Sequence, residues 1–350
     1  MKYLVVQDWS NTRGNHAGME HMCDMLVERW PNEYTKICKS EPSPIIKRDN
    51  LLLRKLLGRY DKYIRSKKWK EEYMKLCKVM FESLKSGDEV FLLEYNWLAT
   101  SQLEIAKYIK NNFNGIRVHA LSHITPTTFK RLHAEKYILE WSKYVDTELT
   151  LGSSLSSYFV ECGIPQSKIS TGYHYVDNNY YKPLDSKNVD EKKKTIIAIG
   201  ALQRDFQTLA EIVNSTTEVN WIICKGRKHV DHLFKGANIR LVGYVQEEEL
   251  RRLMSDSDIS INILEDTVGS NVITTSMAMG LAIIVTNVGS IRDYCNEDNA
   301  IFCKYEKEYI IHEIKKLCRD NVRLHTMKNI SLKESKRFGI ENIHTWFSNL

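Results

Sequence analysis

Short apolar runs alternate with longer segments of helical periodicity along most of this chain. Runs with the length of strands occur at 3–7, 90–93, 118–121, 148–151, 195–200, 220–224, 239–242, 259–264 and 282–286. Segments with the spacing of amphipathic helices occur at 19–29, 99–112, 127–141, 153–162, 205–214 and 246–255, and residues 51–85 are mostly helical and basic. Because strands that alternate with helices form parallel sheets, the pattern predicts an α/β protein.

One segment interrupts this alternation. From Pro183 to Lys194 the chain is polar and charged and has neither period, which indicates a linker. With 350 residues, the chain has the length of two domains of about 100–200 residues each. We therefore expect one domain over residues 1–182 and a second over residues 183–335.

Composition favours an intracellular, soluble protein. No apolar run approaches the roughly 20 residues that cross a bilayer, and Met1–Val6 has the pattern of a short strand rather than of a signal peptide. The eight cysteines are scattered without a CxxC pair, so we expect buried thiols rather than a zinc site or a disulfide framework. These features predict a cytoplasmic protein.

The net charge of +6 is concentrated in one segment. Lys47–Lys70 contains ten basic residues against Asp49 and Asp61, a local charge of +8, among leucines, tyrosines and Trp69. Such a segment can lie on an anionic membrane surface, or it can be a solvated helix packed on its own domain. Nucleic acid is a weaker alternative, and we do not expect it as a partner, because no RNA- or DNA-binding motif accompanies the charge.

The segment between residues 259 and 293 is the most informative part of the sequence. An apolar run, Ile259–Leu264, is followed by a loop with Gly269, Ser270 and Asn271, and then by a helix of small residues that ends at Gly280. A second apolar run over 282–286 completes a βαβ unit. Free N–H groups at the start of such a helix, together with its dipole, attract a phosphate group.

Several motifs in this half resemble a known enzyme family. Ser276–Val285, which reads SMAMGLAIIV, resembles the end of the donor-binding signature of the retaining GT-B-fold glycosyltransferases of family four, the group 1 glycosyltransferases. Asn271 matches a polar position of that signature, whereas its two glutamates fall on Thr267 and Thr275. Further resemblances, in the same order along the chain, cover 168–183, 197–200 and 241–250.

The resemblance implies a fold and a division of labour. It implies the GT-B architecture, two Rossmann-like, doubly wound parallel-sheet domains that face a cleft. Residues 1–182 would hold the acceptor and residues 183–335 the nucleotide-sugar donor. A C-terminal helix over 336–350, with Trp346 and Phe347, would pack back on the first domain.

Loops beyond the carboxyl ends of strands supply the candidate residues of the first domain, because ligands of open α/β sheets bind there. Gly18 lies in a glycine-containing loop that resembles the family's loop facing the donor phosphates, although an ordinary turn has the same pattern. Glu94 follows the strand 90–93 and could accept hydrogen bonds from sugar hydroxyls. The family places a histidine near the transferred sugar, and His123 fits that position better than His119.

Basic residues supply the candidates of the second domain. Arg204 and Lys225 follow strands there, and both side chains suit a diphosphate. The family has an arginine and a lysine at the positions that Ala201 and Phe206 occupy here, so Arg204 and Lys225 would replace them.

The resemblance also assigns residues to the nucleotide. The backbone of Gly243 and Tyr244 would hold the base, and Thr275 would offer the ribose one hydrogen bond where the family has a glutamate. The loop 269–271 would bind the diphosphate.

The resulting hypothesis is a retaining hexosyltransferase. It would transfer a sugar from a nucleotide-sugar donor to a surface-glycan acceptor, expected to be lipid-linked, with no cofactor or bound metal. The protein would be cytoplasmic and could sit peripherally on the inner face of the membrane through residues 47–70. The alternatives are a non-catalytic subunit of the same fold that binds sugar or membrane, and a nucleotide-sugar epimerase.

Overall fold

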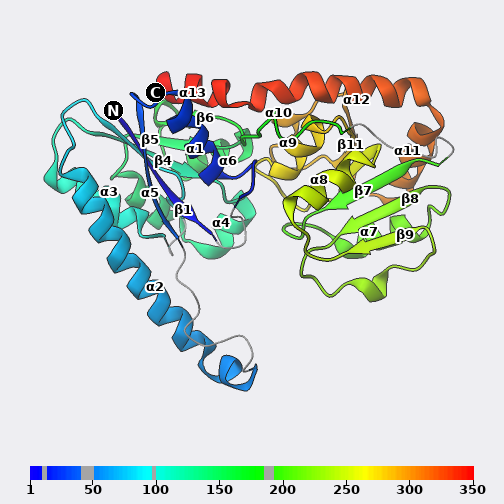
Figure 1. Ribbon diagram of the computed structural model, residues 1–350, viewed down its shortest axis with the longest axis horizontal. Coiled ribbons are helices and arrows are strands. Elements are labelled where there is room, and N and C mark those ends of the chain that lie inside the picture. The colour runs from blue at the N-terminus through cyan, green and yellow to red at the C-terminus, as the bar shows by residue number, and fades with distance from the viewer. Residues whose placement is uncertain (10–13, 41–50, 97–99, 185–192) are drawn as a thin grey trace.

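The computed structural model describes residues 1–9, 14–40, 51–96, 100–184 and 193–350. It contains two six-stranded sheets, each with helices on both faces (Figure 1). Part of the basic segment, 47–50, and most of the expected linker, 185–192, lie outside the described residues. Every strand pair within the two sheets is parallel, which confirms the α/β prediction.

The first sheet has the strand order β2-β1-β3-β4-β5-β6. Its strands are β1 (Lys2–Asp8), β2 (Tyr34–Ser40), β3 (Glu89–Leu92), β4 (Arg117–Ser122), β5 (Thr147–Thr150) and β6 (Ile169–Thr171). Its helices are α1 (Met19–Arg29), α2 (Leu51–Phe81), α3 (Gln102–Asn112), α4 (Pro126–Leu132), α5 (Glu135–Ser142) and α6 (Ser153–Glu161). The strand order reverses between β1 and β3, and such switch points bind ligands in open sheets.

The helix predicted over 127–141 is in fact two helices. Thr125 caps the start of α4, where its side chain accepts a hydrogen bond from the Thr128 N–H group and Pro126 occupies the first helical position. His133 then adopts an extended conformation, so the helical hydrogen bonds stop and α5 begins anew.

The second sheet has the order β12-β11-β10-β7-β8-β9 and reverses between β7 and β10. Its strands are β7 (Thr195–Ile199), β8 (Asn220–Cys224), β9 (Ile239–Val242), β10 (Ile259–Asn262), β11 (Ala282–Thr286) and β12 (Ala300–Cys303). Its helices are α7 (Phe206–Asn214), α8 (Glu247–Ser255), α9 (Asn271–Ala278), α10 (Ile291–Tyr294), α11 (Lys307–Arg319) and α12 (Asn321–Ser335). Isoleucine and valine on both faces of β7 and β11 are buried, and β10 buries Ile259 and Ile261 on one face and Ser260 and Asn262 on the other, as expected for parallel strands covered on both sides.

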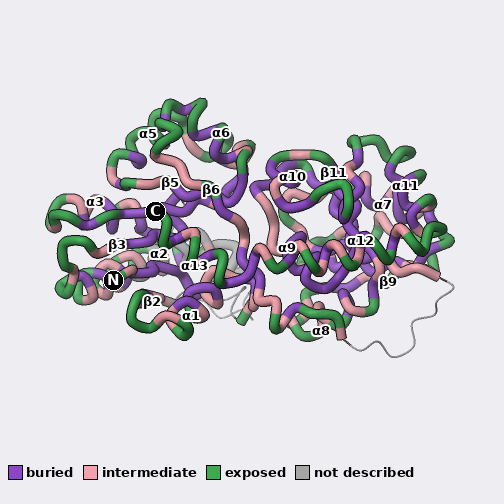
Figure 2. Tube along the Cα trace, turned by 90° about the horizontal axis from the view of Figure 1, so that it is seen from above, coloured by how far each residue is buried: buried purple, intermediate pink, exposed green. Residues whose placement is uncertain are grey.

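The last helix, α13 (Ile340–Ser348), returns to the first sheet. Its residues Ile343 and Phe347 are buried with Leu4 and Phe91, and the Trp346 indole N–H donates to Ser170 Oγ at 2.8 Å. Seen from above, α12 and α13 run in succession from the second domain to the first, over the junction of the two (Figure 2). No described helix combines the length and the apolar character that crossing a membrane requires.

Two carboxylates of the second domain cap helices of the first. Asp266 Oδ2 accepts the Thr127 N–H at 3.2 Å, in the first turn of α4. Asp293 Oδ2 accepts the Ser153 N–H at 2.6 Å, at the start of α6. Because carboxylates stabilise helix N-termini through hydrogen bonds and the helix dipole, these pairs hold the two domains against each other.

Candidate functional site

The switch point of the second sheet brings together the loop after β7 and the loop after β10. Arg204 lies in the first loop, and Gly269 and Ser270 in the second lead directly into α9. A Cβ atom built on Gly200 would lie 3.5 Å from an Arg204 guanidinium nitrogen and 3.7 Å from a Val272 methyl group. The guanidinium therefore lies close to the first turn of α9.

The turn before α9 depends on Gly269. Its φ of +99° lies in the left-handed region, and a Cβ atom there would lie 2.1 Å from the Tyr294 ring. Its N–H donates to Thr267 Oγ1 at 3.0 Å, so this group is engaged inside the protein. Gly269 thus shapes the turn, and the next two residues supply the N–H groups to which no acceptor in the described part of the chain is bonded.

Those two N–H groups mark the open end of α9. The Ser270 side chain accepts from the Val272 N–H at 3.2 Å, so it caps the helix. Within the described part of the chain, no acceptor reaches the backbone N–H groups of Ser270 and Asn271. Two free donors at the positive end of a helix dipole form a site for an anion.

Arg204 adds a full positive charge to this end. Its guanidinium donates to the carbonyl oxygens of Ile199 and Leu202 and to Asn262 Oδ1, at 3.1–3.4 Å. No carboxylate pairs with it among the described residues. Burial lowers the pKa of Arg204 to about 10, so the group remains a cation at neutral pH. A half-buried cation without a counter-ion indicates a site for a negatively charged ligand.

Two histidines lie near the start of α9. His123 directly follows β4, and His174 follows β6, with His123 and Asn271 beside its ring. Burial, with the His123 ring as a lesser cause, lowers the pKa of His174 to about 3, and burial also lowers the pKa of His123. Both rings are therefore neutral at pH 7, when each offers one donor and one acceptor.

Two buried atoms of this group are free. His123 Nδ1 and Asn271 Oδ1 form no hydrogen bond of ordinary geometry within the described residues. Buried polar atoms are nearly always paired, so free ones beside an anion site suggest groups that bind a ligand.

Tyr294, of the second domain, is hydrogen-bonded to two backbone groups of the first domain. Its hydroxyl donates to the Leu151 carbonyl at 2.6 Å and accepts from the His174 N–H at 2.9 Å. The same ring packs against the Gly269 turn. One side chain thus sets the positions of both His174 and the loop that starts α9.

Glu94 lies at the other switch point, after β3. The Trp9 indole N–H, after β1, donates to Glu94 Oε1 at 2.9 Å. Burial raises the pKa of Glu94 to about 7, although the hydrogen bond from Trp9 opposes the shift. A carboxyl group that titrates near neutral pH can act as an acid or a base.

His119, the alternative to His123, is part of the core. It is buried on β4 with its ring stacked on Phe91, 4.7 Å between centroids, and burial lowers its pKa to about 4. Gly18 precedes α1, where its N–H donates to the Asn15 carbonyl at 2.8 Å, and a Cβ atom there would come within 3.0 Å of that oxygen. Gly18 thus belongs to a tight turn.

The remaining basic candidate, Lys225, is engaged elsewhere. Its ammonium group pairs with Asp231 at 2.8 Å and donates to the Lys228 carbonyl at 3.0 Å. The nearby Arg227 guanidinium lies 5.2 Å from the centre of the Tyr244 ring, and Tyr244 is exposed. This stacked pair, next to the exposed Gly243, offers a flat surface on which a base can stack.

Thr275, placed one turn into α9, is buried. Its hydroxyl donates to the Asn271 carbonyl at 2.7 Å inside its own helix. Thr267 is likewise buried and bonds within the Gly269 turn. The hydroxyl protons of both threonines are thus committed within the protein, although their oxygens can still accept.

Comparison with known proteins gives a family match for the second domain. Residues 193–320 match the model of the family described as glycosyl transferases group 1. The second domain of this chain is thus similar to group 1 glycosyltransferases. No curated protein is similar enough to the sequence to count as a match.

Solved structures show the fold. HepE of Anabaena in complex with UDP covers 100% of this chain and 100% of its own, with 12% identity and a TM-score of 0.69. Sucrose-phosphate synthase of Thermosynechococcus elongatus covers 100% and 98%, with 12% identity and a TM-score of 0.73. The lipopolysaccharide outer core galactosyltransferase WaaB, in its apo form, covers 100% of both chains, with 14% identity and a TM-score of 0.69. This chain has the GT-B fold.

The site includes residues that the sequence did not single out. In the segment 168–183, His174 and Tyr175 stand where the family that it resembles has asparagine and glycine, and that departure was the one available signal for His174. Tyr294 gave no local signal, because its role rests on contacts with residues more than a hundred positions away.

Proposed function

We propose that this protein is a retaining glycosyltransferase that transfers a hexose from a nucleotide-sugar donor to a surface-glycan acceptor. The observation that carries the proposal is the unpaired guanidinium of Arg204 beside the free N–H groups of Ser270 and Asn271. The match of residues 193–320 to group 1 glycosyltransferases supports it. So do the solved structures of Anabaena HepE, a similar fold, in complex with UDP and with UDP-glucose.

Charge on the departing diphosphate is the centre of the proposed mechanism. As the bond between the sugar and the phosphate breaks, negative charge grows on the diphosphate oxygens. Arg204 and the two N–H groups are held in place by the protein, so they stabilise that charge without reorganising. The helix dipole of α9 acts in the same direction.

The neutral histidines would bind the sugar. His123 Nδ1 is free, and His174 is anchored through its backbone to Tyr294. Because neither ring carries a charge at pH 7, each can hydrogen-bond a hydroxyl group without competing with Arg204 for the phosphate. The Arg227–Tyr244 pair would stack on the base.

The acceptor would approach the first domain. We propose that it is lipid-linked and that α2 rests on the anionic inner surface of the membrane. In support, α2 projects away from the body of the domain (Figure 1), with Tyr60 and Tyr63 65% and 64% exposed and with Lys67 and Lys68 on the surface. Cations and aromatic side chains on one projecting helix suit an anionic interface.

The buried threonines favour one alternative. Thr267 and Thr275 hold the positions of the family's acidic pair, and both hydroxyls donate within the protein. A chain that lost its acidic groups could bind a nucleotide sugar without turning it over. Binding and turnover must therefore be measured separately.

A nucleotide screen tests the proposal. The melting temperature would be followed with UDP, GDP, dTDP and ADP, and with the nucleoside of whichever diphosphate binds. A ligand that binds only the native state raises the melting temperature. The diphosphate should therefore raise it, whereas the nucleoside should not, because the nucleoside has no negative charge to pair with Arg204. Release of that diphosphate from its sugar conjugate in the presence of glycan acceptors then separates an enzyme from a binding subunit. A protein that no diphosphate stabilises would contradict the proposal.

A further inference from the structure

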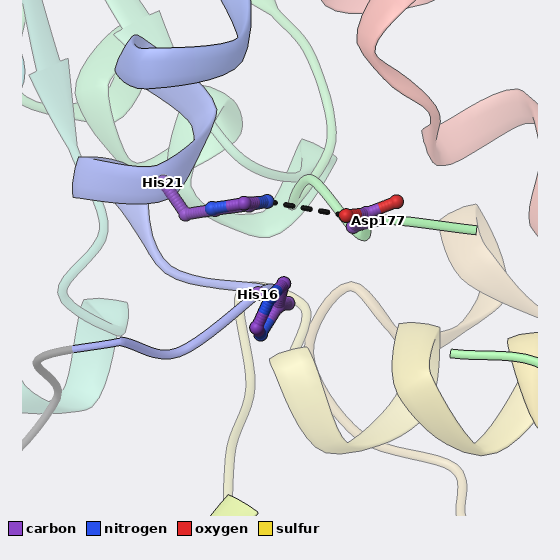
Figure 3. A group of neighbouring side chains, drawn as sticks. All are labelled: His16, His21 and Asp177. Atoms are coloured by element: carbon purple, nitrogen blue, oxygen red, sulfur yellow. Dashed lines mark hydrogen bonds and ion pairs between the residues drawn. The ribbon is translucent and has the colours of Figure 1, made fainter. Parts of the chain in front are cut away.

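A group of possible metal ligands lies where the two domains meet. His16 comes from the loop after β1, His21 from the first turn of α1, and Asp177 from the segment between β6 and β7. One ligand atom from each residue lies within 4.8 Å of the other two. Figure 3 shows His21 directed at Asp177, with His16 beside them on the loop that leads into the helix of His21.

The spacing suits a metal ion. A tetrahedral zinc ion with bonds of about 2.0–2.1 Å sets its ligands about 3.3 Å apart. His21 Nε2 and Asp177 Oδ2 already lie 3.2 Å apart, and the His16 and His21 rings are 4.6 Å apart between centroids. A small movement of the His16 ring would bring its ligand atom to the same spacing from the ligand atoms of His21 and Asp177.

His16 is oriented as metal-binding histidines are. Its Nδ1 lies 2.7 Å from Glu247 Oε2, and its backbone N–H donates to Glu247 Oε1 at 2.8 Å. A carboxylate at Nδ1 holds the proton there and leaves the lone pair on Nε2, which has no hydrogen-bond partner within the described residues. The Tyr180 ring, stacked at 3.7 Å, fixes the plane of the imidazole.

Asp177 is prepared in a similar way. Its Oδ1 accepts the N–H groups of Asn179 and Tyr180, at 2.8 and 3.3 Å, so Oδ2 is the atom that faces the histidines. The backbone thus holds one carboxylate oxygen of Asp177 and leaves the other directed at the histidines.

We propose that His16, His21 and Asp177 bind a divalent transition metal, with zinc as the best match, and that the ion fastens the junction of the two domains. All three side chains are partly exposed, so an ion can enter and water can complete its coordination. Glu247 belongs to α8 of the second domain and also accepts the Tyr181 hydroxyl at 2.6 Å. The ion would link a loop, a helix and the interdomain segment of the first domain to that carboxylate. This inference does not depend on the proposed transfer reaction.

Zinc binding to the chelator-treated, tag-free protein tests the site. Competition with a chromophoric indicator should give one zinc ion per chain, and His21→Ala and Asp177→Asn should each weaken zinc binding by more than about 100-fold, since each removes a ligand. Glu247→Gln should weaken it about 10–100-fold, because it removes only the group that orients His16. The matched control is the double variant His229→Ala/His232→Ala, which removes two exposed histidines elsewhere and should bind as the wild type does.

A second measurement does not depend on variants that fold. Cobalt added to the wild-type protein should give the strong visible absorption of tetrahedral cobalt. One equivalent of zinc should abolish this absorption, because zinc displaces the cobalt. The proposal is overturned by a wild type that binds no stoichiometric zinc, or by binding that the His21 and Asp177 variants leave unchanged. A loss of binding in the His229/His232 control would overturn it as well.

Discussion

The two domains arrange their strands by the same rule, yet they present opposite charges where the strand order reverses. In the second domain the switch point between β7 and β10 holds a guanidinium and free N–H groups, from Arg204, Ser270 and Asn271. In the first domain the switch point between β1 and β3 holds Trp9 and a buried carboxyl group, Glu94. A shared topology fixes where a ligand binds, and the side chains there decide its charge.

The contrast matches a division of labour. Positive groups suit the diphosphate of a donor. A carboxyl group that titrates near neutral pH suits an acceptor hydroxyl, which must lose a proton when it forms a new bond. Under the proposed function, one domain would stabilise the leaving group while the other receives the nucleophile. Four experiments probe this contrast, from the largest expected effect to the smallest.

The largest effect should come from the turn that opens the anion site. Gly269→Ala places a methyl group against the Tyr294 ring at a φ of +99°. We expect the free energy of unfolding to fall by about 2–5 kcal/mol, from the left-handed conformation and from overpacking. Gly226→Ala is the matched control, because Gly226 also has a positive φ, of +59°, but open space around it.

Urea unfolding measures both variants of that pair. The control should lose only about 1–2 kcal/mol, the cost of the left-handed conformation alone. Equal losses in the two variants would mean that the Tyr294 contact does not constrain the turn.

The buried carboxyl group of the first domain should make stability depend on pH. Because burial raises the pKa of Glu94 to about 7 in the folded state, the folded protein holds this proton more firmly than the unfolded chain does. Its contribution to stability is therefore present at low pH and is lost as the pH rises through about 7. Glu94→Gln removes that loss, so above neutral pH the variant should be more stable than the wild type by up to about 3 kcal/mol.

A matched variant separates stability from function. Burial also raises the pKa of Glu148, on β5, to about 7, so Glu148→Gln should show a similar gain in stability. Only Glu94→Gln should also lower sugar transfer, because only Glu94 lies at the switch point. Equal transfer activities for the two variants would place the acceptor elsewhere.

Arg204 supplies the positive charge at the switch point of the second domain. Arg204→Ala removes a charged hydrogen bond to the diphosphate, worth about 1.5–3 kcal/mol, so affinity should fall about 10–150-fold. Arg252→Ala, on the exposed surface of α8 where it pairs with Glu248, serves as the control and should leave affinity unchanged. Calorimetric titration with the diphosphate measures both, and an unchanged affinity for Arg204→Ala would assign the anion site to another group.

Much of the architecture could be predicted from residue patterns, because buried parallel strands are continuous apolar runs. Three strands were missed for a physical reason. β2 and β12 lie at the edges of their sheets, where lysines or short length weaken the apolar signal, and β6 spans only Ile169–Thr171. The helix over 127–141 was divided by His133, whose extended backbone no periodicity indicates.

The candidate site was predictable only in part, because its decisive properties are contacts. The position of Arg204 after a strand was readable, but its lack of a carboxylate partner was not. Lys225 has the same sequence context, yet the structure pairs it with Asp231. His174 and Tyr294 act through interdomain hydrogen bonds, which no local pattern records.

The smallest effect concerns α2, the helix that projects from the first domain (Figure 1). Lys67 is exposed on α2, so Lys67→Gln should weaken binding to anionic vesicles by about 1 kcal/mol, roughly 5-fold, and added salt should shrink the difference. Lys143→Gln, an exposed position at the end of α5, is the control. Co-sedimentation at low and high salt measures both, while diphosphate binding should be unchanged, because the donor site belongs to the other domain. A wild type that does not sediment at low salt would make α2 a solvated helix, and the proposed lipid-linked acceptor would lose its main support.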